Sequence, residues 1–194
     1  MKSNLRTGTI PGTLLDSEKL GGVTGAEFIE KVFYVTDGIM LSQIREITGI
    51  DGTTLQNWLR RGWVPNPTKK TYSRDQLARI LLINMMRDTL KLSDIISLLA
   101  YVNGENETVS ECALYDIVCR VLTAVSESEG GIGGLDDMII GILADESFPS
   151  DDKKRVLFAV RVIVISYYAT TMKSTAEFML SALGLQGEDG ENGK

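Results

Sequence analysis

The chain has 194 residues, of which 43% are hydrophobic and 24% charged, as is usual for a globular protein with a full core. It contains no histidine, so it lacks the commonest general base and the commonest metal ligand. It also carries no nucleophile motif and no paired carboxylates that point to a cleft. These features argue against an enzyme and against a bound metal or cofactor.

The charge is unevenly distributed along the chain. The net charge of −6 and the pI near 4.8 argue, taken alone, against binding to nucleic acid. Residues 39–91, however, hold nine Lys or Arg and four Asp or Glu, a balance of +5, whereas the remainder holds eleven and twenty-two, a balance of −11. Positive charge concentrated in one segment suits an acidic partner at that segment.

Cysteine usage and hydropathy indicate a cytoplasmic protein that is not embedded in a membrane. Cys112 and Cys119 are seven residues apart on a predicted helix, which is not the close spacing of a zinc or redox pair. We expect buried thiols, with a redox sensor as the alternative. The N-terminus has no signal-peptide core. The apolar run 156–172 is interrupted by Arg161 and is shorter than the roughly 20 residues of a membrane span, so it is expected to be a buried helix.

The N-terminal region predicts an arm followed by a short helix. Residues 1–25 are rich in Gly and Thr and show little periodicity, which indicates an extended or partly ordered arm. Residues 26–36 predict a helix with Phe28, Val32 and Val35 on one side, and Asp37-Gly38 ends it.

Residues 41–61 predict two helices joined by a tight turn. Leu41, Ile44 and Ile47 have helical spacing, and Gly49 is placed to end that helix. A second helix, wound from Thr53, puts Leu55, Trp58 and Leu59 on one face, with Trp58 in the core. The connection is so short that the helices must cross steeply, as in a helix-turn-helix.

The opposite face of the second helix carries side chains of the kinds that read DNA bases. Amides suit adenine, and arginine suits guanine, in the major groove. The candidate groove-facing residues are Thr53, Thr54, Gln56, Asn57 and Arg60. The alternative is an ordinary solvated helix face.

Residues 63–71, here called the basic loop, contain two prolines and two lysines. Phosphate contacts fix the register of a protein on DNA without reading its sequence. The candidates for such contacts at this loop are Arg61, Lys69, Lys70 and Tyr72, with Arg74 and Arg79 as weaker ones. A solvated basic loop is the alternative, and Trp63 is expected either beneath the loop or against the DNA backbone.

The rest of the chain predicts further helices. Ser73 begins one with a capping-box pattern to Gln76, and another spans 92–102. After a polar, acidic loop at 103–109, helices are expected at 111–126, at 135–144 after a flexible Gly-rich connection, and from an N-cap at Ser150 to about 172 or on to 183. Residues 185–194 are expected to be a disordered tail.

Arg161 lies inside the apolar part of the last helix. One interpretation is an effector pocket with Tyr167 and Tyr168 as companions. An ion pair with one of the many acidic residues, buried or at an interface, is preferred.

Four stretches, LSQIREITGI, TTLQNWLRRGW, KKTYSRDQLARI and MMRDTLKLSDIISLL, resemble the winged helix-turn-helix of MerR-type transcriptional regulators over residues 40–99. Lys70 and Tyr72 match the Arg-x-Tyr of that family's wing. Gln56 and Asn57 stand where the family has Arg-Tyr, and Lys69 replaces the first wing tyrosine. The C-terminal half shows neither the MerR dimerisation heptads nor a metal-sensing loop. As a whole, the chain more closely resembles domain-of-unknown-function family 1836, regarded as regulators.

Together these patterns predict an all-α protein: a winged helix-turn-helix (MerR-like) followed by a C-terminal helical bundle. The expected organisation is an N-terminal arm and short helix at 1–38, a DNA-binding domain at 39–102, a helical dimerisation or effector domain at 103–184, and the tail at 185–194. The expected function is regulation through double-stranded DNA, read by a homodimer at half-sites about 34 Å apart. A protein–protein interaction module without DNA binding is the alternative, and a small-molecule effector is left open.

Overall fold

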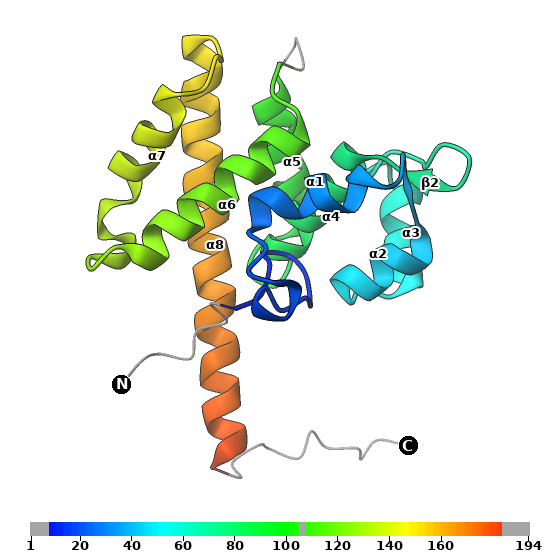
Figure 1. Cartoon of the computed structure of the whole chain (residues 1–194), viewed down its shortest axis with the longest axis horizontal. Helices are drawn as coiled ribbons and strands as arrows, with labels where there is room; N and C mark the ends of the chain where they lie inside the picture. Colours follow the sequence, from blue (N-terminus) through cyan, green and yellow to red (C-terminus); the bar gives the residue numbers. More distant parts are fainter. Residues whose placement is uncertain (1–7, 105–107, 184–194) are drawn as a thin grey trace.

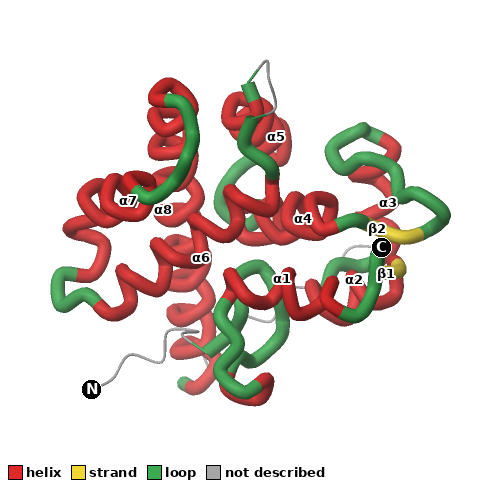
Figure 2. The backbone as a smooth tube through the Cα atoms, turned by 45° about the horizontal axis from the view of Figure 1, so that its top comes forward, coloured by secondary structure: helices red, strands yellow, loops and turns green. Residues whose placement is uncertain are grey.

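The computed structural model describes residues 8–104 and 108–183, except the Ala26 side chain, and the expected tail at 185–194 lies outside this part. The described chain is mostly helical with two short strands, which confirms the all-α prediction (Figures 1 and 2). The elements are η1 Glu18–Leu20, α1 Gly25–Tyr34, β1 Ile39–Met40, α2 Leu41–Thr48, α3 Gly52–Arg60, β2 Thr71–Tyr72, α4 Arg74–Met86, α5 Leu92–Asn103, α6 Glu111–Glu127, η2 Gly131–Gly134, α7 Leu135–Ala144 and α8 Ser150–Ala182.

Residues 8–24 form an ordered N-terminal strap. Ile10 is buried, the Leu14 amide donates to the Ile47 carbonyl at 2.8 Å, and the Tyr115 hydroxyl donates to the Pro11 carbonyl at 2.8 Å. The strap therefore connects α2 to α6. The part of the expected arm that the structure describes is thus ordered, and residues 1–7 lie outside the described part.

Helix α1 begins at a capping box formed by Thr24 and Glu27. Its buried face differs from the predicted one. Phe28, Ile29 and Phe33 are buried, whereas Val35 lies past the end of the helix and is exposed. Helix α1 ends at Tyr34, so Val35 is not on its buried face and the predicted apolar stripe lacks its last residue.

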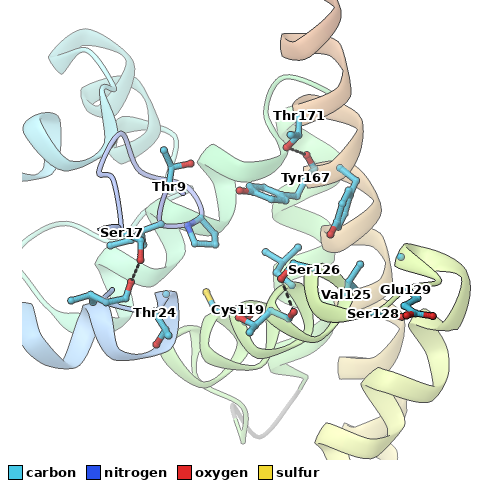
Figure 3. A pocket seen from close by; sticks show the side chains of 18 residues that line it. Thr9, Ser17, Thr24, Cys119, Val125, Ser126, Ser128, Glu129, Tyr167 and Thr171 are labelled. Carbon is cyan, nitrogen blue, oxygen red and sulfur yellow. Dashed lines mark hydrogen bonds between the residues drawn. The ribbon is translucent and has the colours of Figure 1, made fainter. Parts of the chain in front are cut away.

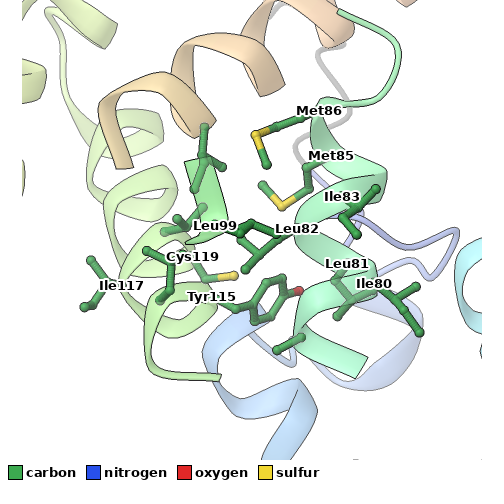
Figure 4. Packing of buried hydrophobic residues seen from close by; sticks show 14 of the residues in the cluster. Ile80, Leu81, Leu82, Ile83, Met85, Met86, Leu99, Tyr115, Ile117 and Cys119 are labelled. Carbon is green, nitrogen blue, oxygen red and sulfur yellow. The ribbon is translucent and has the colours of Figure 1, made fainter. Parts of the chain in front are cut away.

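Helix α4 lies at the centre of the molecule. Eight of its 13 residues are buried, and it contacts α1, α2, α5, α6 and α8. A helix that is apolar on nearly all sides is expected to be surrounded by other elements. Figure 4 shows Leu82 and Met85 of α4 facing Tyr115 and Cys119 of α6. The predicted capping box of Ser73 and Gln76 is present at its start.

The C-terminal half is built around α8. Helices α4, α5, α6 and α7 all contact it. Its N-cap is Pro149, one residue before the predicted Ser150, and it continues to Ala182 without interruption. The connection expected to be flexible contains the short 3₁₀ helix η2. Buried side chains from the strap to α8 form one hydrophobic cluster, so the central helices and the bundle share a core.

By length and composition, α8 is the one described helix that could cross a membrane, and 39% of its most apolar window is buried inside the protein. Core helices of globular proteins meet the same criteria.

Candidate nucleic-acid interface

Helices α2 and α3 lie at the opposite end of the molecule from α7 (Figure 1). Gly49 ends α2 in the left-handed conformation, with φ of 71°, and its amide donates to the Arg45 carbonyl at 2.8 Å. Ile50 is buried, and Asp51 then caps α3 by accepting the Thr54 amide at 2.9 Å. The turn is therefore fixed at both ends, as the short connection predicts.

The C-terminus of α3 is closed by a Schellman motif. Gly62 has φ of 69°, its amide donates to the Leu59 carbonyl at 3.0 Å, and the Trp63 amide donates to the Trp58 carbonyl at 2.9 Å. Glycine at this position reaches positive φ without the penalty that a Cβ brings. The chain leaves α3 directly into the basic loop.

The two faces of α3 divide as the sequence predicts. Leu55 and Trp58 are buried, and the exposed outer residues are Thr53, Gln56, Asn57 and Arg60. The Arg60 guanidinium donates to the Asn57 amide oxygen at 2.8 Å, so these two side chains are positioned together. Thr54 is only half-exposed, and its hydroxyl donates to Asp51. Its polar group therefore already serves the helix cap.

Lys69 and Lys70 form the tip of the basic loop. Both are exposed and both have positive φ, 50° and 68°. The Thr68 and Thr71 amides donate to each other's carbonyls at 3.1 and 2.9 Å, which closes a two-residue turn. Positive φ at both central residues is the pattern of a type I′ hairpin turn, which normally selects Asn or Gly. The turn projects both ammonium groups into solvent.

The basic loop is attached to the body at two places. β2 pairs antiparallel with β1, with Ile39 opposite Tyr72. The Gln76 side-chain amide donates to the carbonyls of Pro65 and Asn66 at 2.9 and 3.0 Å. These bonds hold the loop against the start of α4.

Two candidate phosphate contacts are corrected by the structure. Tyr72 is only 2% exposed, and burial raises the pKa of its hydroxyl, so its ring belongs to the core beneath the loop. Arg79 is largely buried, donates to the Trp63 carbonyl, and forms an ion pair with Glu111. Both residues therefore support the loop from inside. Strand alternation explains Tyr72, because its neighbour Thr71 faces outward.

Two further cations lie near the candidate interface. Arg45, which the sequence analysis did not single out, is exposed on α2, and its side chain lies beside Gly52 at the start of α3. Arg45 follows Ile44 directly and lies outside the predicted apolar stripe of α2. This position in the sequence indicates that its side chain is exposed. Arg61 lies 4.9 Å above the Trp63 ring, which places both at the exit of α3.

The exposed charges at the α2–α3 end of the molecule are mostly positive, but an acidic residue lies at the start of α3. Asp51 is exposed at the N-terminus of α3, and hydrogen bonds from the Thr54 hydroxyl and amide lower its pKa. It is therefore ionised at neutral pH. An anion here completes the helix cap but repels a nearby phosphate.

A separate cavity of about 530 Å³ lies between the strap, α6 and α8 (Figure 3). Tyr167 and Tyr168 line it, and Glu129 is the one charged residue among its described lining. Its size is that of a small-molecule site, and its lining suits a neutral, largely apolar compound. Arg161 is not part of it. Instead, Arg161 forms a bidentate ion pair with Asp136 at 2.7 Å. The preferred sequence interpretation is therefore right about the ion pair, but the pair lies at the surface of the single chain and is not buried.

No described group of His, Cys, Asp or Glu side chains could hold a metal ion. The two cysteines are unbridged, and burial raises the pKa of both Cys112 and Cys119. A raised thiol pKa lowers the fraction of reactive thiolate.

Comparison with known proteins gives one match. Residues 28–118, a little under half of the chain, match the family model described as Domain of unknown function (DUF1836). This segment runs from α1 into the middle of α6, so it includes the candidate interface and the central helix α4. No curated protein and no solved structure matches the chain.

Proposed function

We propose that the segment matching this family, residues 28–118, is a DNA-binding module of the winged helix-turn-helix type and that the protein is a transcriptional regulator. In this proposal α3 lies in the major groove, with Gln56, Asn57 and Arg60 facing base edges. The basic loop serves as the wing, with Lys69 and Lys70 on phosphates.

The observation that carries the proposal is the conformation of Lys69 and Lys70. A non-glycine residue in the left-handed region costs about 1–2 kcal/mol, and here two adjacent lysines adopt it. Two charged, exposed side chains at the tip of a loop contribute nothing to the core that offsets this cost. A role in contacting an anionic partner accounts for lysine at positions where a turn favours asparagine or glycine.

The arrangement of the cations is the second support. Arg60 and Arg61 end α3, and the loop that carries Lys69 and Lys70 follows directly and returns through β2 at the same end of the molecule (Figure 2). Of the 26 Asp and Glu residues, 22 lie outside residues 39–91. An anionic duplex is therefore attracted to one end and repelled elsewhere.

The test is binding of the full chain to duplex DNA selected from a random-sequence pool, measured by fluorescence anisotropy over a series of salt concentrations. We expect affinity that falls steeply as salt rises, because phosphate contacts release counterions. The Arg60→Ala/Lys70→Ala variant should lose about tenfold or more in affinity and show a shallower salt dependence, with unchanged helicity by circular dichroism.

The matched control is Lys19→Ala/Lys154→Ala, which removes the same charge from two exposed sites outside residues 28–118. It should leave affinity unchanged. Absence of salt-sensitive binding by the wild-type chain, or an equal loss in both double variants, would contradict the proposal and favour a protein-interaction module.

A further inference from the structure

Helix α8 carries an apolar stripe on the side that the bundle leaves uncovered. Its members follow one another at alternating intervals of four and three residues: Phe158, Val162, Ile165, Ala169, Met172, Ala176, Met179 and Leu183. None of the eight is buried, and Met172 and Leu183 are 65% and 70% exposed. Alternating three- and four-residue spacing is the seam of a coiled coil.

The stripe extends beyond the body of the protein. The bundle covers α8 through Val156, Val160 and Ile163, and the last buried residue is Thr171. Residues 172–183 carry no buried side chain and project from the body (Figure 1). A helical segment of this length is marginal in water without packing on one face. The projecting turns of α8 therefore need another surface to pack against their apolar side.

We propose that a second copy of this chain covers the stripe, so that two α8 helices form an antiparallel coiled coil. Residues 1–7 and 184–194 contain few apolar side chains and no long apolar run, so their composition does not suit them to cover the stripe. The charged residues of α8 between 158 and 183 are already paired, Arg161 with Asp136 and Lys173 with Glu177. Two identical stripes can therefore approach without net like-charge repulsion.

The antiparallel orientation follows from the sizes of the side chains. One set of seam positions is mostly large and the other mostly small, and only an antiparallel pair sets the two against each other in every layer. In that register the layers are Phe158 with Leu183, Val162 with Met179, Ile165 with Ala176, and Ala169 with Met172 of the second copy. A parallel pair would instead stack Ala on Ala and Met on Met, which gives layers of unequal width.

The size of the surface suits a stable dimer. The stripe spans 26 residues, or about 38 Å of helix. Tyr101, which contacts the Phe158 ring edge-on, and Leu180 flank it. With these two, seven large apolar side chains are about half or more exposed, which amounts to on the order of 700 Å² per copy. A standard interface buries about 800 Å² per partner.

The test is the mass of the full chain in solution by sedimentation or light scattering over a concentration series. We expect a dimer, twice the 21.3 kDa chain mass. The Met172→Glu/Met179→Glu variant should be a monomer with unchanged helicity of the body, because both side chains are exposed in the single chain. The control is Phe178→Glu, because this side chain is 70% exposed on the same turn and helical spacing places it away from the stripe. It should stay dimeric.

Orientation is tested by disulfide trapping in a Cys112→Ser background under a glutathione redox buffer. A mixture of Val162→Cys and Met179→Cys chains should form a linked dimer. Met179→Cys chains alone should not, because their two sulfurs would lie about 25 Å apart in the antiparallel register. Linking of Met179→Cys alone would overturn the antiparallel arrangement.

A monomeric wild-type chain, or a dimer that survives Met172→Glu/Met179→Glu, would overturn the proposal. So would a monomer that sediments with anionic phospholipid vesicles through the stripe, since a membrane surface would then be its occupant. The test uses no DNA, so its outcome is separate from that of the proposed function. If both proposals hold, the dimer supplies two copies of α3 and the basic loop, one for each DNA half-site.

Discussion

At the residue level, Lys69 and Lys70 connect backbone geometry to function. A turn that needs positive φ at two positions is most stable with glycine or asparagine there, and this chain has lysine at both. If the lysines serve only the fold, they are a poor choice. If they contact phosphate, their contribution to binding offsets the free-energy cost of positive φ at both positions.

We therefore predict that the Lys69→Gly/Lys70→Gly variant loses DNA affinity without losing stability. Thermal unfolding should show stability unchanged or raised by up to about 1 kcal/mol, because relief of the strained φ is partly offset by the entropy of glycine in the unfolded chain. Affinity for duplex DNA should fall. If the variant binds DNA as tightly as the wild type does, Lys69 and Lys70 do not contact DNA.

At the level of the element, α3 combines a stable cap with an unfavourable charge. Asp51 accepts the Thr54 amide and so stabilises the first turn of α3, yet it places an anion at the end that faces DNA in the proposal. Asparagine caps a helix about as well as aspartate does. The two effects can therefore be separated by one substitution.

The Asp51→Asn variant should fold with unchanged helicity at neutral pH and bind duplex DNA more tightly than the wild type, by anisotropy at fixed salt. Its folding stability should also lose the pH dependence that the Asp51 carboxylate confers. The pKa of Asp51 is lowered in the folded state, so its contribution to stability is present above the unfolded pKa and is lost as pH falls through the folded pKa. Unchanged affinity would mean that the start of α3 lies away from phosphate.

At the level of the whole molecule, α4 makes the candidate interface and the C-terminal bundle parts of one core. Its side chains pack on α2, α6 and α8, and Asn84 donates to the carbonyls of both Gly12 and Thr48. The strap thus reaches the end of α2 through a central residue. Elements that share buried side chains in this way are expected to unfold together.

We predict one cooperative unfolding transition. The fluorescence of Trp58 and Trp63, which reports on α3 and the start of the basic loop, should change together with the circular dichroism signal of all helices. Leu82→Ala should shift both together by about 2–5 kcal/mol, because Leu82 is fully buried in α4. A fluorescence transition that precedes the helical one would show that α2 and α3 unfold independently of the bundle.

Local patterns predicted most of the helices because the information is local. Helical spacing, the Ser73–Gln76 capping box and the glycine at the end of α2 act within a few residues, and each is found as expected. The exposure of Lys69 and Lys70 follows from their position in the proline-containing basic loop, and the outer face of α3 follows from helical spacing. The buried position of Trp58 does so as well.

Tertiary packing decided what spacing alone leaves open. Tyr72 and Arg79 are polar groups beside a basic loop, and only the contacts with β1, Trp63 and Glu111 show that they support it from inside. The eight-residue stripe of α8 has regular spacing in the sequence, but it overlaps an apolar core stretch, and spacing alone does not separate the two. Which of its apolar sides faces solvent depends on where α4 to α7 pack, because burial is a property of neighbours and not of the helix itself.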